Sequence, residues 1–123
     1  MDWYYVENTN GDLATVWRTI NGVKYYFDPN WYYMYGQGRY EIDGKGYCFA
    51  RSGALQTNGF SDYGWGDRYY ADADGVLHGG WLEIDGVRYY FDPNFNYMYY
   101  NTYETIDDIE YYFDYDGHAS IVE

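Results

Sequence analysis

The chain has little of what disulfide-linked, metal-binding or nucleic-acid-binding proteins require. Its one cysteine, Cys48, excludes an intrachain disulfide and a cysteine-based metal site, and we interpret it as a small buried hydrophobic residue. Seven basic residues stand against 20 acidic ones, for a net charge of −13. Because binding to phosphate backbones or to anionic membranes needs clustered Lys and Arg, neither nucleic acid nor a membrane is an expected partner.

Long hydrophobic runs are also missing. No stretch is long enough to span a membrane, and Met1 is followed by acidic and aromatic residues instead of the basic start and apolar run of a secretion signal. Two localisations therefore stay open: the cytoplasm for a complete chain, and the cell surface or the medium for a module cut from a longer protein.

Aromatic residues are abundant instead, at 26% of the chain, with 21 Tyr. A chain rich in Tyr and poor in Leu, Ile and Val is expected to pack by stacking rings along strands. An aromatic pair (once split by Cys48) returns about every 21 residues. The first members of these pairs are Tyr4, Tyr25, Tyr47, Tyr69, Tyr89 and Tyr111. A fixed period of this length indicates stacked supersecondary units.

The unit with the most complete pattern predicts a β-hairpin. Residues 17–20 alternate large and polar side chains, Asn21-Gly22 is a strong two-residue turn, and 24–27 form the return strand before Asp28-Pro29-Asn30 ends it. No segment has helical periodicity. We therefore predict an all-β fold, a β-hairpin solenoid of about six repeats forming one domain over 1–123. The approximate units are 3–16, 17–37, 38–59, 60–80, 81–100 and 101–123.

Variation among the units refines this picture. The turn recurs at Asp43-Gly44 and Asp85-Gly86, is degraded at 64–67, and becomes Asp107-Asp108 in the last unit, where we expect strain or rearrangement because Asp enters the left-handed region less readily than Gly. A shift of 64 residues places Trp17 on Trp81. Units three apart should therefore face similar directions.

Two segments of the chain carry a resemblance to a known family. Residues 20–28 read Ile-Asn-Gly-Val-Lys-Tyr-Tyr-Phe-Asp, and residues 84–92 read Ile-Asp-Gly-Val-Arg-Tyr-Tyr-Phe-Asp. With Gly80-Trp81 as an opening and Asp74-Gly75 and Asp116-Gly117 as returns, the chain resembles the cell-wall-binding repeats of choline-binding proteins, glucansucrases and large clostridial toxins. The resemblance implies a hairpin solenoid whose rings bind a quaternary ammonium through cation–π attraction, or sugars. It also implies a non-enzymatic module that needs no cofactor, has a glycan or cell-wall polymer as its partner, and can dimerise through open sheet ends.

One departure from the choline-binding pattern favours sugars. Choline binders often have Trp directly before the aromatic pair, whereas only Trp3 holds that place here and Lys24, Arg68 and Arg88 stand in three later units. A cation there would repel a quaternary ammonium. The predicted ligand-binding residues come from the ring positions of two units and from the loops after Asp-Pro-Asn, with purely structural stacking as the alternative. They are Trp17, Tyr25, Trp31, Trp81, Tyr89 and Phe95.

A second hypothesis comes from the distribution of charge. No Lys or Arg follows Arg88, so the last third is acidic. The chain would then be a small intracellular inhibitor of phage or mobile-element type, a nucleic-acid mimic or anti-CRISPR-like protein that binds a basic nucleic-acid-binding protein. The simpler interpretation is that the acidic residues of the last third form a solvated edge, which keeps an aromatic protein soluble. The predicted contacts are Glu104, Asp107, Asp108, Glu110, Asp114 and Asp116.

The sequence offers no catalytic constellation. His78 and His118 lack a neighbouring nucleophile motif and are interpreted as surface residues, and a thin solenoid offers no deep cleft in which carboxyl pKa values would shift. Residues 72–75 lack the terminal glutamate of a calcium loop. We therefore expect no enzymatic activity, no metal and no cofactor.

Overall fold

The computed structural model describes residues 16–61 and 67–123, which form antiparallel strands and, within these ranges, no helix. The strands pair as four hairpins, β1–β2, β3–β4, β5–β6 and β7–β8, followed by the three-stranded sheet β9–β10–β11. The predicted all-β hairpin solenoid is confirmed. The unit predicted for 3–16 lies outside the described residues, apart from Val16. The strands are β1 Val16–Ile20, β2 Val23–Phe27, β3 Gly38–Ile42, β4 Lys45–Phe49, β5 Gly59–Ser61, β6 Tyr69–Ala71, β7 Gly80–Ile84, β8 Val87–Phe91, β9 Thr102–Ile106, β10 Ile109–Phe113 and β11 Ala119–Ile121.

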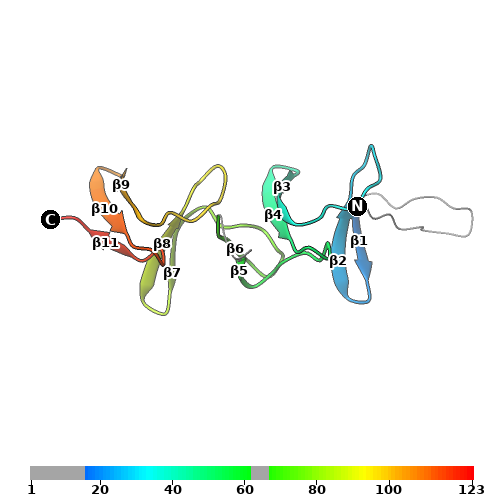
Figure 1. Ribbon diagram of the computed structural model, residues 1–123, viewed down its shortest axis with the longest axis horizontal. Coiled ribbons are helices and arrows are strands. Elements are labelled where there is room, and N and C mark those ends of the chain that lie inside the picture. The colour runs from blue at the N-terminus through cyan, green and yellow to red at the C-terminus, as the bar shows by residue number, and fades with distance from the viewer. Residues whose placement is uncertain (1–15, 62–66) are drawn as a thin grey trace, which may run out of the picture.

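The hairpins follow one another along an extended rod, from β1 at one end to β11 at the other (Figure 1). Hairpins β1–β2 and β7–β8 point to one side of the rod, and β3–β4 and β9–β10 point to the opposite side in this view. The expectation that units three apart face similar directions is therefore confirmed. Because of this arrangement, the same repeat position points in a different direction around the rod in consecutive units.

The hairpin turns have the geometry that the sequence predicts. Asn21, Asp43 and Asp85 have φ of 53°, 52° and 51°, and the glycine after each has φ of 79° to 81°. Asp107 and Asp108 keep this geometry, with φ of 51° and 67°, so of the two expected outcomes the turn is not rearranged but holds a non-glycine residue in the left-handed region, where it is strained. The degraded turn at 64–67 falls outside the described residues except for Asp67.

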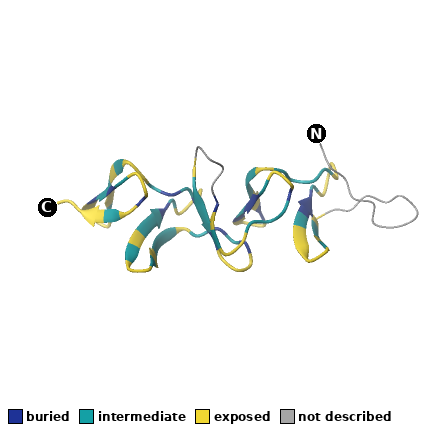
Figure 2. Ribbon diagram, turned by 60° about the horizontal axis from the view of Figure 1, so that its bottom comes forward, coloured by how far each residue is buried: buried dark blue, intermediate teal, exposed yellow. Residues whose placement is uncertain are grey.

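The core is a row of side chains at the last position of each return strand. Phe27 is 2% exposed, and Phe49, Phe91 and Phe113 are fully buried, while Ala71 takes this place in β6. The chain then doubles back and bridges to the same residue. The bridges are Phe27 to Met34, Phe49 to Leu55, Ala71 to Leu77 and Phe91 to Met98. In the last unit this third segment is the strand β11, which pairs with β10. Figure 2 shows exposed residues at the hairpin tips and buried ones where consecutive units meet.

Each unit is attached to the one before it by its doubled-back segment. The backbone N–H groups of Leu55, Leu77 and Met98 donate to the carbonyls of Lys24, Gly46 and Arg68, at 2.9, 2.9 and 2.8 Å. Beside these bonds, Gly75 approaches Leu55 so closely that a Cβ atom would lie 2.7 Å from its side chain. Cys48 is buried among Ala71 and Leu77 of the next unit, as its interpretation as a buried hydrophobic residue predicts. A unit therefore completes its core only when its neighbour is present.

Replacing Phe91 by Ala tests the core against a matched control. Phe91→Ala removes a fully buried ring and should lower the free energy of unfolding by about 3–5 kcal/mol. Phe95→Ala removes an equal ring that is 61% exposed and should change it by less than about 0.5 kcal/mol. Urea unfolding followed by circular dichroism measures both. Equal losses in the two variants would contradict the assignment of the core.

Candidate functional site: the gaps between hairpins

Rings from consecutive hairpins meet in the gap between them. The second residue of a hairpin's first strand contacts the first tyrosine of the next hairpin's aromatic pair, with centroid separations of 4.8 to 5.3 Å. The pairs are Trp17 with Tyr47, Phe60 with Tyr89, and Trp81 with Tyr111. The register explains the contact, because Trp17, Phe60 and Trp81 all lie opposite the second member of their own aromatic pair. Each gap is therefore built from the same two repeat positions.

The gap at Trp81 contains a cation from the chain itself. The guanidinium carbon of Arg88 lies 3.9 Å from the centroid of the Trp81 ring and 5.8 Å from that of Tyr111. Both distances fall within the range of cation–π attraction, which is strongest for Trp. Arg88 stands directly before the aromatic pair Tyr89-Tyr90, the position that Lys24 and Arg68 hold in other units.

The gap between β3–β4 and β5–β6 is filled differently, because Arg39 replaces the ring. Its side chain is 16% exposed, and its Nε and Nη2 donate to Asn96 Oδ1 at 3.2 and 2.8 Å, across 57 residues of sequence. Asn96 in turn donates from Nδ2 to the carbonyl of His78 at 3.2 Å. Gly46 leaves room for this contact, because a Cβ atom there would collide with Asn96 Oδ1. This network takes the place that a ring of the first strand holds in the other gaps, and Tyr69 of the next hairpin packs against Cys48 and Leu77 beside it.

The gap at Phe60 is an open pocket of about 400 Å³. Phe60, Arg68, Tyr89, Asp116 and His118 line it, so two rings, a guanidinium, a carboxylate and an imidazole meet there. Within the described ranges, Arg68 has no salt bridge or side-chain hydrogen bond. His118 packs edge-on against Tyr89, with centroids 5.4 Å apart. The pocket therefore combines apolar faces with donors and acceptors, as sites for small polar ligands do.

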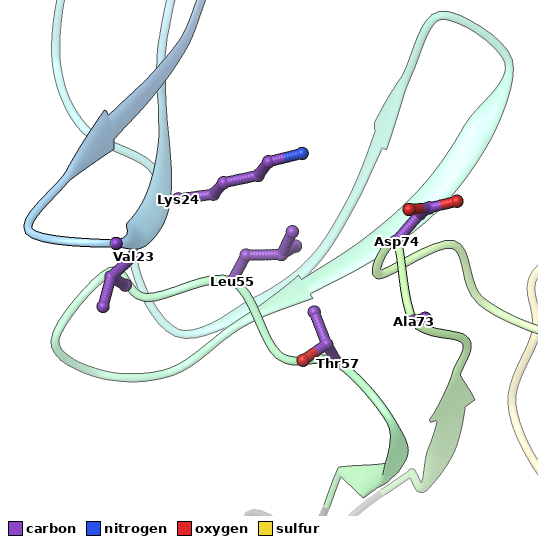
Figure 3. A pocket seen from close by; sticks show the side chains of 7 residues that line it. Val23, Lys24, Leu55, Thr57, Ala73 and Asp74 are labelled. Carbon is purple, nitrogen blue, oxygen red and sulfur yellow. The ribbon is translucent and has the colours of Figure 1, made fainter.

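A related pocket of about 350 Å³ lies near the N-terminal end of the described residues, lined by seven residues including Gly22. In Figure 3, Lys24 extends from β2, Asp74 stands on a loop beyond Leu55, and Thr57 lies below them. Its polar pair occupies the same repeat positions as the polar pair of the Phe60 pocket, because Lys24 and Arg68 both precede an aromatic pair. Asp74 and Asp116 both precede the glycine of a return turn. A cation and a carboxylate therefore recur in two gaps.

Two loops hold exposed rings outside the gaps. Trp31 is 73% exposed and Phe95 is 61% exposed. In the second loop Asp92 Oδ1 accepts the backbone N–H groups of Asn94 and Phe95 at 2.9 and 2.8 Å, and Asp92 Oδ2 accepts the Tyr99 hydroxyl at 3.1 Å. The loop at Asp28 repeats these bonds to Asn30, Trp31 and Tyr35. The aspartates thus fix the loops that carry the rings.

These bonds change the acidity of the aspartates and of their tyrosine partners. Burial raises the pKa of Asp92, but the N–H groups of Phe95 and Asn94 and the Tyr99 hydroxyl outweigh it and hold the pKa below its ordinary value. The N–H of Trp31 is the main cause of the lowered pKa of Asp28. Burial, followed by the hydrogen bond to Asp92, raises the pKa of Tyr99 well above the ordinary value.

The six predicted ligand-binding residues do not converge on one pocket. Trp17 and Trp81 lie half-buried in two separate ring clusters, and Tyr89 lines the Phe60 pocket. Tyr25 is half-buried in β2 opposite Arg18, and Trp31 and Phe95 stand in the loops.

Sequence reasoning missed Phe60, Arg68 and His118 as pocket residues. Phe60 occupies the repeat position of Trp17 and Trp81, and this spacing was the signal that could have found it.

The six acidic residues of the alternative hypothesis have different environments. Asp107, Asp108, Glu110 and Asp116 are exposed, and Asp116 also lines the Phe60 pocket. Asp114 Oδ1 accepts the backbone N–H groups of Asp116 and His118, so this carboxylate stabilises a turn. Glu104 accepts the Thr102 hydroxyl at 3.1 Å and lines a pocket of about 270 Å³ with Asp67 and Tyr97.

The described residues contain neither a metal-binding cluster nor a membrane-spanning helix. Across 16–61 and 67–123, no three His, Cys, Asp or Glu side chains are grouped so that they could hold a metal ion. Nor does this part of the chain contain a helix that is long and apolar enough to cross a membrane.

Comparisons with known proteins relate the chain to a cell wall binding repeat, a glucosyltransferase and choline binding proteins. The family model of the cell wall binding repeat matches residues 16–30 and 79–94. Glucosyltransferase-S of Streptococcus mutans is 37% identical over 90 residues, which are 72% of this chain and 6% of that protein. The chain therefore spans a small part of this relative.

Solved structures resemble the chain along most of its length. Choline binding protein F of Streptococcus pneumoniae, crystallised with a tetrasaccharide-pentapeptide analogue of peptidoglycan, is 26% identical with a TM-score of 0.78, over 97% of this chain and 38% of that one. A truncated alternansucrase of Leuconostoc mesenteroides is 29% identical with a TM-score of 0.54, over 91% of this chain and 10% of that one. These similarities do not support the hypothesis of an acidic inhibitor.

The lowered pKa of Asp92 predicts an acid-sensitive loop. Because its pKa is lower in the folded chain than the ordinary 3.8, the ionised carboxylate stabilises the fold above pH 3.8, and this contribution is lost as the pH falls through the folded pKa. Asp92→Asn should cost about 1 kcal/mol at pH 7 and less at pH 2. Urea unfolding at pH 7, 5, 3 and 2 measures the difference.

Asp85→Asn is the matched control for this measurement. It removes one charge but creates an Asn-Gly turn like that at Asn21-Gly22, so its effect on stability should be close to zero. A loss in Asp92→Asn that is the same at pH 7 and pH 2 would show that the carboxylate charge does not stabilise the loop.

Proposed function

Because this chain belongs to the cell-wall-binding repeat family, we propose that it is a non-catalytic module that binds carbohydrate, as part of a glucan or a cell-wall polymer, in the gap between β5–β6 and β7–β8. The observation that carries the proposal is the open pocket at Phe60 and Tyr89, with Arg68 and Asp116 at its wall. Among the gaps of the described residues, this one combines a ring pair, open space and polar groups.

The pocket matches the two surfaces of a sugar ring. A pyranose has apolar C–H faces and a rim of hydroxyls, so it needs ring faces beside hydrogen-bonding groups. Phe60 and Tyr89 supply rings 5.3 Å apart between centroids. Arg68 can donate to hydroxyl or ring oxygens, and Asp116 can accept from hydroxyls. The volume of about 400 Å³ is in the range of sites for small ligands.

The charges in the gaps favour a sugar over a quaternary ammonium ligand. Lys24 and Arg68 line the two pockets, and Arg88 lies against Trp81. A permanently cationic ligand would meet a positive charge in each of these places, whereas a neutral sugar gains hydrogen bonds from the same groups. The peptidoglycan analogue used with choline binding protein F, and the similarity to a glucosyltransferase, support this choice.

The remaining predicted residues are proposed as outer contacts. The loops after β2 and β8 lie on the same side of the rod in Figure 1, so the exposed rings of Trp31 and Phe95 can touch a polymer that is longer than the pocket. Trp17 and Tyr25 belong to the hairpin that adjoins the Lys24 pocket, where we propose that a second sugar unit binds.

Binding measurements with pocket variants test this function. Phe60→Ala and Tyr89→Ala should each weaken binding of dextran or of a peptidoglycan tetrasaccharide at least about tenfold, or 1.4 kcal/mol, because each removes one ring face. Isothermal titration and affinity electrophoresis give the constants. Tyr115→Ala, which removes a ring that is 69% exposed and outside the pocket, should bind like the parent.

Two outcomes would reject the proposal. If the parent chain binds none of the glycans at millimolar concentration, it is not a carbohydrate module. If Tyr115→Ala weakens binding as much as Tyr89→Ala does, the pocket is not the site. Release of reducing sugar from either glycan by the purified chain would contradict its non-catalytic character.

Glycans of different length distinguish contacts at the loop rings from contacts in the pocket. A double variant, Trp31→Ala with Phe95→Ala, should weaken binding of high-molecular-weight dextran several-fold and leave binding of a trisaccharide unchanged, because only a polymer reaches both loops and the pocket. Affinity electrophoresis with polymers and titration with the trisaccharide measure the two values. An equal loss of affinity for both ligands would show that the loop rings contribute to binding of the trisaccharide in the pocket itself.

A further inference from the structure

We propose that the cavity beside Glu104 is a separate binding site, for a sugar unit that carries a protonated amine. The cavity has a volume of about 270 Å³, and its seven lining residues differ from those of the pocket at Phe60. The inference goes beyond the proposed function, because it concerns another cavity and a charged ligand.

The cavity lies where one ring of the repeat is missing. A shift of 64 residues relates the two halves of the chain and places Tyr35 on Tyr99 and Tyr40 on Glu104. In the first half the rings of Tyr35 and Tyr40 stack, with centroids 4.2 Å apart and planes inclined by 11°. Tyr40 and Glu104 both lie opposite the first tyrosine of their own hairpin's aromatic pair. In the second half a carboxylate therefore stands where the first half has a stacked ring.

The other ring contacts of the two halves are alike, so the difference is local. Tyr99 lies 5.1 Å from Tyr90 and 5.7 Å from Tyr97 between ring centroids, and the equivalent separations around Tyr35 are 5.0 and 5.8 Å. The hydroxyl of Tyr99 donates to Asp92 at 3.1 Å, as its counterpart in the first half does to its own aspartate. Among the described residues, no other ring takes the place of the missing one. A ligand ring can therefore stack on Tyr99.

The groups around this space are acidic. Asp67 and Glu104 line it, as does Thr102, whose hydroxyl donates to Glu104 at 3.1 Å, and none of the seven lining residues is basic. Burial raises the pKa of Tyr97 most and Asp92 is the next cause, while the charges of the two lining carboxylates raise it further. Two carboxylates from different units thus act on one hydroxyl of the cavity wall.

A pyranose with an ammonium group matches both features. Its apolar C–H face packs on a tyrosine ring, in the place that a six-membered ring holds in the first half. Its ammonium group donates to carboxylates, and such charge-assisted hydrogen bonds are stronger than those between neutral groups. A quaternary ammonium ion has no N–H to donate, so it gains no directional bond from the same carboxylates. The volume lies just below that of sites for drug-sized ligands, which suits a single sugar unit.

The test uses a tetramer of glucosamine as the probe, with its fully N-acetylated form as the neutral reference. Isothermal titration at pH 6 and constant ionic strength should show at least about tenfold tighter binding of the free amine. Glu104→Gln keeps the shape of the side chain and an acceptor for Thr102, and should weaken tetramer binding at least about fivefold. Glu110→Gln is the matched control, because it removes an exposed carboxylate from β10, and it should bind like the parent.

A second variant, Glu104→Tyr, restores the missing ring. The new ring should stack on Tyr99 as Tyr40 stacks on Tyr35, so that the cavity closes and tetramer binding falls to the level of the acetylated form. Circular dichroism should show that the melting temperature is unchanged or higher. A folded Glu104→Tyr that binds the tetramer like the parent would overturn the inference. Equal losses in Glu104→Gln and Glu110→Gln would show attraction by overall charge alone, and would also overturn it.

Spermine, a linear amine with the same number of amino groups, tests whether the ligand must be a sugar. It should lose no more affinity in Glu104→Gln than in Glu110→Gln, because it binds by charge without a ring to stack. A loss of spermine affinity confined to Glu104→Gln would show a site for amines of any shape, and would overturn the assignment of a sugar.

NMR titration separates this site from the proposed function. The glucosamine tetramer should shift the resonances of Tyr99 and Thr102, whereas dextran should shift those of Tyr89 and His118 in the Phe60 pocket. Tetramer shifts confined to Tyr89 and His118 would overturn the inference. A parent chain that binds the tetramer at Tyr99 but does not bind dextran would reject only the proposed function.

Discussion

The structure depends on the stacking of each hairpin on its neighbour. A two-stranded hairpin is marginal by itself in water, because one face of it has nothing to pack against. Here the last residue of the return strand, such as Phe49 or Phe91, becomes buried only when the doubled-back segment and the next unit close over it. The hydrogen bond from Leu77 N–H to the Gly46 carbonyl fixes the position of one unit on the other. Stability and the geometry of the gaps therefore have the same origin.

Because the stacking repeats, one sequence position always faces the gap, and its identity decides what the gap becomes. Trp17, Arg39, Phe60 and Trp81 hold this position in the four described hairpins that another hairpin follows, and Tyr103 holds it in the last. With Arg39 the gap is filled by a hydrogen-bonded network to Asn96, and with Phe60 it is open. The loss of repeat regularity, which the sequence alone presents as degeneration, corresponds in the structure to gaps that are filled differently on one scaffold.

The sequence predicts the fold well because its signals are local. The tyrosine period defines the units, and Asn21-Gly22 and its equivalents define the turns. The third segment of each unit escapes prediction because it bridges through a single residue, such as Met98, and has no alternating pattern. The sites are harder to predict, since they join residues from units that lie two apart. Nothing local connects Arg39 with Asn96, and nothing local connects His118, which is exposed as the sequence predicts, with Tyr89 on the other side of the pocket.

The few basic residues of this acidic chain have a common placement. Of its seven Lys and Arg, four lie in the gaps, namely Lys24, Arg39, Arg68 and Arg88. At the turns of β7–β8 and β9–β10, by contrast, the tips are acidic and exposed, which favours solubility of a ring-rich surface. A cation beside a ring can stack on it, as Arg88 does, or remain available to donate hydrogen bonds, as Arg68 does. A basic residue before the aromatic pair therefore produces two different gaps, one filled by a stacked guanidinium and one that stays open beside a guanidinium that can donate hydrogen bonds.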